Sequence, residues 1–412
     1  MVKPRRLVTT VLAGIAMHAS VTWADAPDKT AVPMLGGWDL TIGDRDRARP
    51  SWVKLFIRDR KPAAEFIGSG GGKQKIDEVR ISDRAAYWKI GDRVYRAQLV
   101  DGKLTGNVTR NDESPVPLSG ERVVRTVQLD GTWTMVVQLP DRQIERTLHL
   151  KRIEDRTTGT YIGGRFPEYP VSDAVLDGDQ LTFTVNIKEP DISITYHYAF
   201  SVQGDRMIGT LQLPGVPGRF EAIARRERTW SEPIRLFNGK DLTDWSYQPS
   251  GAENHWHAAE GIMVNRKGGA NIFTNGTFTD FKLELEVRVP EGGNSGMYLR
   301  GRYEVQVADD HGKAPSPGGM GAVYGRVIPI ANASKPAGEW NLFEITFVNY
   351  WLTVVLNDRT IVDNQLIEGI TGGALDSRER LPGPILLQGD HGPIEYRNLW
   401  LTPLAEEQPT GS

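Results

Sequence analysis

Short stretches in which every second residue is apolar recur along most of the chain. Residues 148–152, 181–185, 281–288 and 343–347 all alternate in this way. A period of two is typical of a strand that buries one face and exposes the other. Gly- and Asp-rich turns separate these stretches, and long amphipathic helical patterns are scarce. The pattern therefore predicts an all-β protein of short antiparallel strands.

The first half of the chain contains two similar segments. Leu35-Gly36-Gly37-Trp38 opens the first segment, and Leu129-Asp130-Gly131-Thr132-Trp133 opens the second. The spacing of about 95 residues indicates a duplicated unit. We predict two small antiparallel β modules, residues 32–125 and 126–229, each a lipocalin-like barrel or sandwich. Trp38 and Trp133 begin strands, so we expect them to plug the end of each core rather than to bind a ligand.

A third domain is predicted over residues 233–405. The charged linker 225–233 ends in Pro233, which cannot donate to a β ladder, so the next strand starts after it. In residues 281–288 one face is apolar and the other is charged, as a β-sandwich needs. Glu284 and Glu286 lie on the charged face as an alternative catalytic pair, but the alternating Lys282 and Arg288 favour a solvated outer surface.

Polar side chains gather on one face of a hairpin in this third domain. Counting by two across the turn at residues 301–302 places Tyr298, Arg300, Glu304 and Gln306 together. A phenol, a guanidinium, a carboxylate and an amide can hold several hydroxyls of one sugar ring. The alternative without a function is an exposed salt bridge between Arg300 and Glu304.

Further candidates follow from the last predicted strand. Gln388 faces away from the apolar side, and the turn after it places His391 beside the polar face. A divalent cation is a candidate cofactor of unknown identity, with Glu304, Asp309 and His391 as candidate ligands.

The order of motifs from Leu236 onward resembles the 3-keto-disaccharide hydrolase domain family. The motifs are Leu236-Phe237-Asn238-Gly239, Gly293-Asn294-Ser295-Gly296-Met297-Tyr298, Tyr303-Glu304-Val305-Gln306-Val307, Gly321-Ala322-Val323-Tyr324-Gly325 and Leu387-Gln388-Gly389-Asp390-His391-Gly392. The resemblance implies a concanavalin-like jelly roll with sugar bound on its concave sheet. Asn294 and Tyr324, which stand in these motifs, join Tyr298, Gln306 and Gln388 as candidate substrate-binding residues.

The resemblance to this family implies cleavage of 3-keto-glycosides. Ordinary glycosidases use two carboxylates that flank the bond, whereas here only Glu304 lies on the polar face. A ketone at carbon 3 acidifies the hydrogen at carbon 2, so one base, one enolate stabiliser and one proton donor suffice. We expect Glu304 or His391 to act as the base and Arg300 or a cation to stabilise the enolate. The alternative is a non-catalytic carbohydrate-binding or adhesion protein.

Composition and the N-terminus limit the remaining possibilities. A net charge of −3 with both signs interspersed gives no case for nucleic acid. A basic start, an apolar stretch at residues 7–19 and small residues near Ala24 predict a signal peptide over residues 1–26. The 412-residue chain has no cysteine, hence no lipid-modified one, so we expect a periplasmic or secreted protein. No second long apolar run follows, which predicts no integral membrane segment after signal cleavage.

Overall fold

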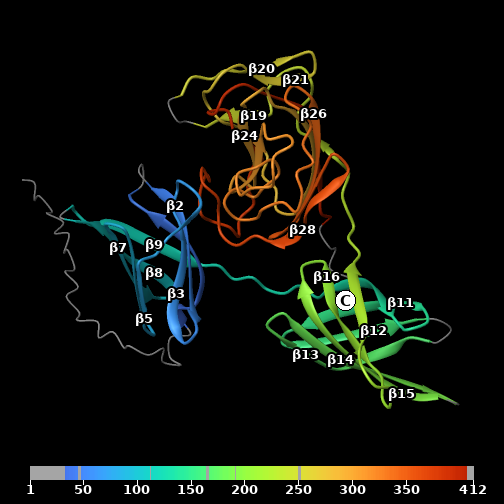
Figure 1. Cartoon of the computed structure of the whole chain (residues 1–412). Helices are drawn as coiled ribbons and strands as arrows, with labels where there is room; N and C mark the ends of the chain where they lie inside the picture. The colour runs from blue at the N-terminus through green and yellow to red at the C-terminus, as the bar shows by residue number, and fades with distance from the viewer. Residues whose placement is uncertain are drawn as a thin grey trace, which may run out of the picture.

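The computed structural model describes residues 33–44, 48–111, 113–163, 167–190, 192–248 and 252–405. The predicted signal peptide lies outside these residues. The described residues form thirty strands, which confirms the predicted all-β class. Figure 1 shows three β assemblies, coloured blue to teal, green, and yellow to red along the chain.

The first assembly, called module 1 from here on, is one antiparallel sheet in the order β4-β3-β2-β1-β9-β8-β7-β6-β5. Its strands are β1 (Gly36–Ile42), β2 (Arg49–Arg58), β3 (Lys61–Ile67), β4 (Lys73–Gln74), β5 (Glu78–Ile81), β6 (Ala85–Ile90), β7 (Arg93–Val100), β8 (Lys103–Arg110) and β9 (Val116–Arg122). The sheet curls around a core in which Trp88 stacks on Tyr95 with ring centroids 5.1 Å apart.

The second assembly, module 2, is a closed barrel in which each strand pairs with the next. Its strands are β10 (Gly131–Gln138), β11 (Gln143–Ile153), β12 (Arg156–Ile162), β13 (Tyr169–Asp177), β14 (Gln180–Glu189), β15 (Ile192–Gln203), β16 (Arg206–Gln212) and β17 (Phe220–Arg226). Pairing of β10 with β17 closes the barrel.

Both modules are closed at one end in the same way. The indole of Trp38 donates to the Met34 carbonyl, and that of Trp133 donates to the Leu129 carbonyl. Arg122 lies 4.4 Å from the Trp38 ring centroid, and the equivalent Arg226 lies 4.5 Å from that of Trp133. Both tryptophans are fully buried, so they plug the cores as predicted.

The third assembly is the jelly roll, which has two antiparallel sheets. The larger sheet contains β18 (Ile234–Arg235), β20 (Trp256–Ala259), β21 (Ile262–Asn265), β23 (Phe281–Arg288), β26 (Trp340–Val348), β27 (Trp351–Leu356), β28 (Arg359–Leu366) and β30 (Ile394–Pro403). The smaller sheet has the order β19-β22-β29-β24-β25. Its strands are β19 (Trp245–Tyr247), β22 (Ile272–Thr274), β29 (Leu386–Leu387), β24 (Asn294–Leu299) and β25 (Tyr303–Ala308).

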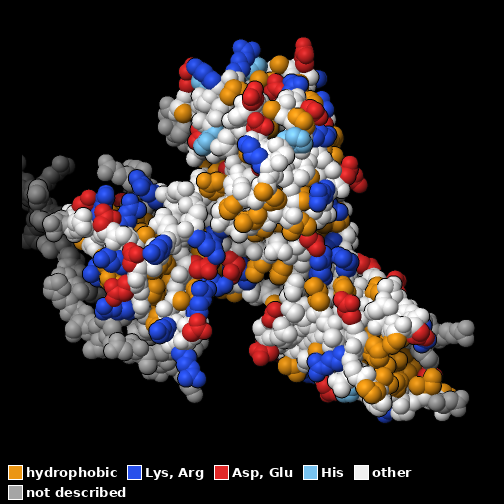
Figure 2. All heavy atoms as spheres, viewed as in Figure 1, with side chains coloured by type: hydrophobic (Ala, Val, Ile, Leu, Met, Phe, Trp, Pro, Cys, Tyr) orange, Lys and Arg blue, Asp and Glu red, His pale blue; other side chains and the backbone are white. Residues whose placement is uncertain are grey.

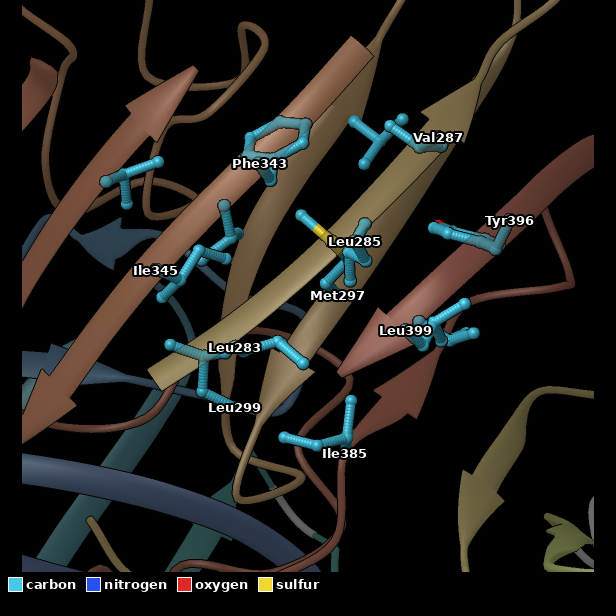
Figure 3. Packing of buried hydrophobic residues seen from close by; sticks show 14 of the residues in the cluster. Leu283, Leu285, Val287, Met297, Leu299, Phe343, Ile345, Ile385, Tyr396 and Leu399 are labelled. Atoms are coloured by element: carbon cyan, nitrogen blue, oxygen red, sulfur yellow. The ribbon is translucent and has the colours of Figure 1, made fainter. Parts of the chain in front are cut away.

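The core of the jelly roll lies between its two sheets. Leu283 and Leu285 of β23 and Phe343 of β26 face Met297 and Leu299 of β24 (Figure 3). The odd-numbered residues of β24 and β25 are therefore used for packing. Their even-numbered neighbours point to the other face of the smaller sheet, away from the core.

Both modules contact the jelly roll. Lys54 of module 1 pairs with Glu368 at 2.7 Å, and Arg206 of module 2 pairs with Asp363 at 2.8 Å. Figure 2 shows acidic and basic side chains side by side where module 1 meets the jelly roll. In the part of the chain described, no helix is long and apolar enough for a membrane crossing.

Candidate functional site

Glu304 lies between two tyrosines on the outward face of the smaller sheet. It is directly opposite Tyr298 in the β24–β25 pair. On the other side, Val305 forms a bridge with Val323, and the Tyr324 amide donates to the Glu304 carbonyl at 3.1 Å. Directly opposed residues share a face of a sheet. Tyr298, Glu304 and Tyr324 therefore form one row, as the predicted alternation requires for the first two.

A glycine makes room for the Glu304 carboxylate. Gly296 lies opposite Gln306 in the strand pair, and its carbonyl accepts a hydrogen bond from the backbone N–H of Gln388 at 2.9 Å. A Cβ at Gly296 would lie only 2.4 Å from Glu304 Oε1. The carboxylate thus lies over the space that a side chain would fill, with the Gln306 and Gln388 amides on either side.

The row of amides continues beyond the predicted residues. The pairing of Ile272 with Leu387 places Asn271 opposite Gln388. The Asn271 side chain donates to Gln248 Oε1 at 2.9 Å. Sequence reasoning missed Asn271 and Gln248 because each lies just outside a short strand, where no run of alternation marks its face. Gln248, Asn271, Gln388 and Gln306 form a polar strip across the smaller sheet.

Two amide oxygens in this strip are buried without a hydrogen-bond partner among the described residues. They are Gln306 Oε1 and Gln388 Oε1. The Gln306 amide nitrogen, in contrast, donates to Asn294 Oδ1 at 2.5 Å. Buried polar atoms in folded proteins almost always have partners. Sugar hydroxyls, which donate hydrogen bonds, are the kind of group that would satisfy both oxygens.

The environment of Glu304 tunes its acidity. Only 5% of its surface is exposed. Burial raises the pKa of the carboxyl, a hydrogen bond from Tyr298 lowers it, and the negative charge of Asp390 raises it, so that the pKa is about 7. Burial and the Glu304 charge raise the pKa of Tyr298 as well, so its hydroxyl stays protonated. A carboxyl with a pKa near neutrality can both accept and return a proton.

Arg300 does not lie on this face, so its predicted position in the polar row is wrong. It adopts a left-handed conformation with φ of 52° at the turn, which interrupts the alternation of the strand. Its guanidinium donates to Asp280 Oδ1 at 2.6 Å and lies 4.6 Å from the Phe347 ring centroid. Arg300 is thus paired with Asp280 and not with Glu304, which also removes the alternative of an Arg300–Glu304 salt bridge.

His391 is paired with a carboxylate that the sequence reasoning overlooked. His391 Nδ1 lies 2.6 Å from Asp390 Oδ1, and the His391 side chain is 46% exposed. The negative charge of Asp390 contributes to the raised pKa of both Glu304 and Tyr298. Its position in the motif around residues 387–392 was the available signal. The side chains of Asp390 and His391 are both about half exposed, whereas Glu304 is buried.

The candidate metal ligands are not brought together. In the described part of the chain, no three or more His, Asp or Glu side chains form a group that fits a metal ion. Asp309 follows the end of β25, about 16 Å along the strand direction from Glu304. There its carboxylate accepts a hydrogen bond from the Gly292 amide. The structure therefore does not bring the candidate ligands Glu304, Asp309 and His391 together.

The comparisons with known proteins agree with the predicted resemblance. Residues 232–402 match the family model of the 3-keto-alpha-glucoside-1,2-lyase-like domain. A 3-keto-disaccharide hydrolase of Bacteroides thetaiotaomicron is 24% identical over an alignment of 170 residues that covers 32% of this chain and 58% of that protein. This chain therefore spans little more than half of that relative. The C-terminal part is similar to a family of glycosidase-like hydrolases.

Two solved structures are among those similar to part of this chain. Two proteins from Parabacteroides distasonis, each described as a “putative glycosyl hydrolase”, are 32% and 25% identical to this chain. The matches cover 42% of this chain and 83% and 100% of those chains, with TM-scores of 0.37 and 0.35.

Proposed function

We propose that the jelly roll cleaves the glycosidic bond of 3-keto-glycosides, including 3-keto-disaccharides, with Glu304 as the base. The observation that supports this most directly is the position of Glu304. It is a buried carboxyl with a pKa of about 7, between two tyrosines and beside amides whose oxygens lack partners. One base of this kind is what elimination next to a ketone requires.

The reaction proceeds in two stages. Glu304 takes the proton from carbon 2, and the electrons of that C–H bond move into an enolate whose negative charge rests on the carbon 3 oxygen. Because Arg300 is held by Asp280, we assign the stabilisation of the enolate oxygen to uncharged donors. These are the Gln388 side-chain amide and, once Glu304 is protonated and no longer accepts from it, the Tyr298 hydroxyl.

The enolate then expels the group at carbon 1. A double bond forms between carbons 1 and 2, the bond from carbon 1 to the leaving oxygen breaks, and that oxygen takes a proton. We assign the supply of this proton to His391, which is half-exposed and bonded to Asp390. Addition of water across the new double bond, with Glu304 returning its proton to carbon 2, completes a net hydrolysis. Without that addition, the outcome is that of a lyase.

The protein is also proposed to act outside the cytoplasm. The support is the basic and apolar character of residues 1–26. Mass spectrometry of the protein recovered from the periplasm or the medium of an expressing bacterium would give the mature N-terminus. Recovery of the uncleaved chain from the cytoplasm alone contradicts export.

The central test uses release of the leaving group from a 3-keto-glucoside. We expect Glu304→Gln to lower kcat by about 10²- to 10⁴-fold and His391→Ala to lower it less. The matched control is Glu284→Gln, an exposed glutamate on the outer face of the larger sheet, and it should keep full activity. Full activity in both Glu304→Gln and His391→Ala contradicts the proposal. Binding of the sugar without any release by the unaltered protein instead favours the carbohydrate-binding alternative.

A further inference from the structure

Glycines from two parts of the chain meet beside the candidate site. The loop Gly68–Gly72 of module 1 lies against Gly372 and Gly325 of the jelly roll. A Cβ at Gly71 would lie 2.9 Å from the Gly372 backbone, and a Cβ at Gly325 would lie 3.0 Å from that of Gly72. Such a close approach of two backbones is possible only because neither carries a side chain. We call this contact the glycine seam.

The glycine seam reaches the row that contains Glu304. The Gly373 amide donates to the Ser69 carbonyl of module 1 at 3.2 Å. A Cβ at Gly373 would lie 2.6 Å from the Tyr298 hydroxyl. Module 1 is therefore separated from Tyr298 by a single residue of the jelly roll.

The glycine seam also holds Tyr324. A Cβ at Gly71 would lie 3.4 Å from one edge of the Tyr324 ring, and a Cβ at Gly318 would lie 3.5 Å from the other. Tyr324 is 37% exposed, whereas Tyr298 on the opposite side of Glu304 is 2% exposed. The exposed ring, with a glycine near each edge, is an open aromatic surface next to the base.

Firm docking of module 1 fixes this arrangement. Trp52, Ile67 and Val123 of module 1 form one buried cluster with Ile370 and Ala374 of the jelly roll. The guanidinium of Arg326, two residues after Tyr324, lies 5.4 Å from the Trp52 ring centroid. The segments that carry Tyr324 and Gly373 are thus packed on module 1.

We propose that module 1 forms one wall of the sugar site and holds Tyr324 as a stacking surface for the leaving group. The substrate class is then a 3-keto-glycoside whose leaving group is itself a ring, either a second sugar or an aromatic alcohol. An aromatic ring, or the C–H face of a sugar ring, can stack on the exposed face of Tyr324. This inference rests on the proposed function, since it assigns the part of the substrate that leaves.

The experiment compares a ring-shaped leaving group with a small one in the full chain. Binding of phenyl and methyl 3-keto-glucosides is measured with proteins that carry Glu304→Gln, so that turnover does not consume the compounds. Both are also used in kinetic assays with Glu304 intact. Tyr324→Ala removes the ring, and Gly71→Ala displaces the wall. Gly102→Ala is the matched control. Gly102 lies in the same module and has a positive φ similar to that of Gly71, but its Cβ would meet open space.

We expect Tyr324→Ala and Gly71→Ala to weaken binding of the phenyl compound about fivefold to tenfold and to raise its KM equally. The methyl compound should change less than twofold, and Gly102→Ala should affect neither. Equal effects on both compounds, or none, overturn the inference even when the unaltered protein is active. If the unaltered protein binds both compounds but releases nothing, the proposed function fails, and the binding ratios alone still decide the role of Tyr324.

Discussion

The position of the Glu304 carboxylate depends on Gly296, a neighbour without a side chain. Gly296 leaves the space over which the carboxylate lies, at 2.4 Å from where a Cβ would stand. Gly296→Ala fills this space, so we expect the carboxylate to move and kcat to fall about tenfold or more. Activity on a 3-keto-glucoside gives the measurement. Gly276→Ala, whose Cβ meets only the movable ring of Phe278 at 3.3 Å, should keep its activity. Unchanged kcat in Gly296→Ala contradicts the position assigned to the base.

The acidity of Glu304 sets a pH dependence. A base must be deprotonated, so kcat/KM should rise with pH and level off above a midpoint near 7, the pKa of Glu304. Tyr298→Phe removes the hydrogen bond that lowers this pKa, so the midpoint should move to higher pH. Profiles of kcat/KM from pH 5 to 9 measure both effects, with Tyr247→Phe, at an edge strand, as the control. A midpoint that stays in place or falls in Tyr298→Phe excludes Glu304 as the titrating base.

Side-chain direction was predictable where the strand is regular and not where it turns. Tyr298, Glu304 and Gln306 share a face because two-residue alternation holds through β24 and β25. Arg300 departs because its left-handed backbone rotates the side chain toward Asp280. A positive φ at a non-glycine residue leaves no mark in the sequence, so two-residue alternation could not predict the direction of the Arg300 side chain.

At the scale of single elements, a tryptophan and an arginine close each module. Trp133 is fully buried, its indole donates to the Leu129 carbonyl at 2.9 Å, and Arg226 covers its ring. Trp133→Ala should destabilise module 2 by about 3–5 kcal/mol, because a large buried ring is replaced by a cavity. Urea unfolding of the full chain, followed by circular dichroism, reports the change as a lower midpoint for one transition. Trp400→Ala, at an exposed tryptophan, should shift the midpoint little. Equal shifts in the two variants contradict a plugging role.

The sequence predicts a duplicated unit, but it does not predict how each sheet closes. Trp38 and Trp133 occupy the same place in two similar arrangements, as the repeat predicts. The second module closes through pairing of β10 with β17, whereas the first ends in β4 and β5 without a ladder between them. Closure depends on strand stagger around the whole sheet, which local alternation does not encode.

At the scale of the molecule, module 1 and the jelly roll act as one unit through contacts between residues far apart in the chain. Lys54 and Glu368 are 314 positions apart, and no periodic pattern connects them. Deep in the same interface, the Glu379 backbone amide donates to Asp39 Oδ2 at 3.0 Å, while Tyr303, next to Glu304, donates to Glu379 Oε2 at 2.8 Å. This hydrogen-bond network links the docking of module 1 to the strand that carries the base.

The pairing of Asp39 with Glu379 makes this docking sensitive to pH. Burial, followed by the charge of Glu379 and a hydrogen bond with it, raises the pKa of Asp39 from 3.8 to about 9. The docked state therefore holds a proton that the unfolded chain releases. The stabilisation is complete below the unfolded pKa and is lost as pH rises toward 9, at up to about 1.4 kcal/mol per pH unit.

Replacing this proton-binding group tests the coupling across the interface. Asp39→Asn should be less sensitive to pH than the unaltered protein, because an amide keeps its hydrogens at every pH. Urea midpoints at pH 6, 8 and 10 measure the slope, with Asp101→Asn, an exposed residue of the same module, as the control. Because Tyr303 adjoins Glu304, the unaltered protein should also lose kcat above pH 9 as the interface loosens, and Asp39→Asn should lose less. If the midpoint of the unaltered protein does not fall between pH 6 and 10, or if Asp39→Asn falls just as steeply, the proton is not held at this interface.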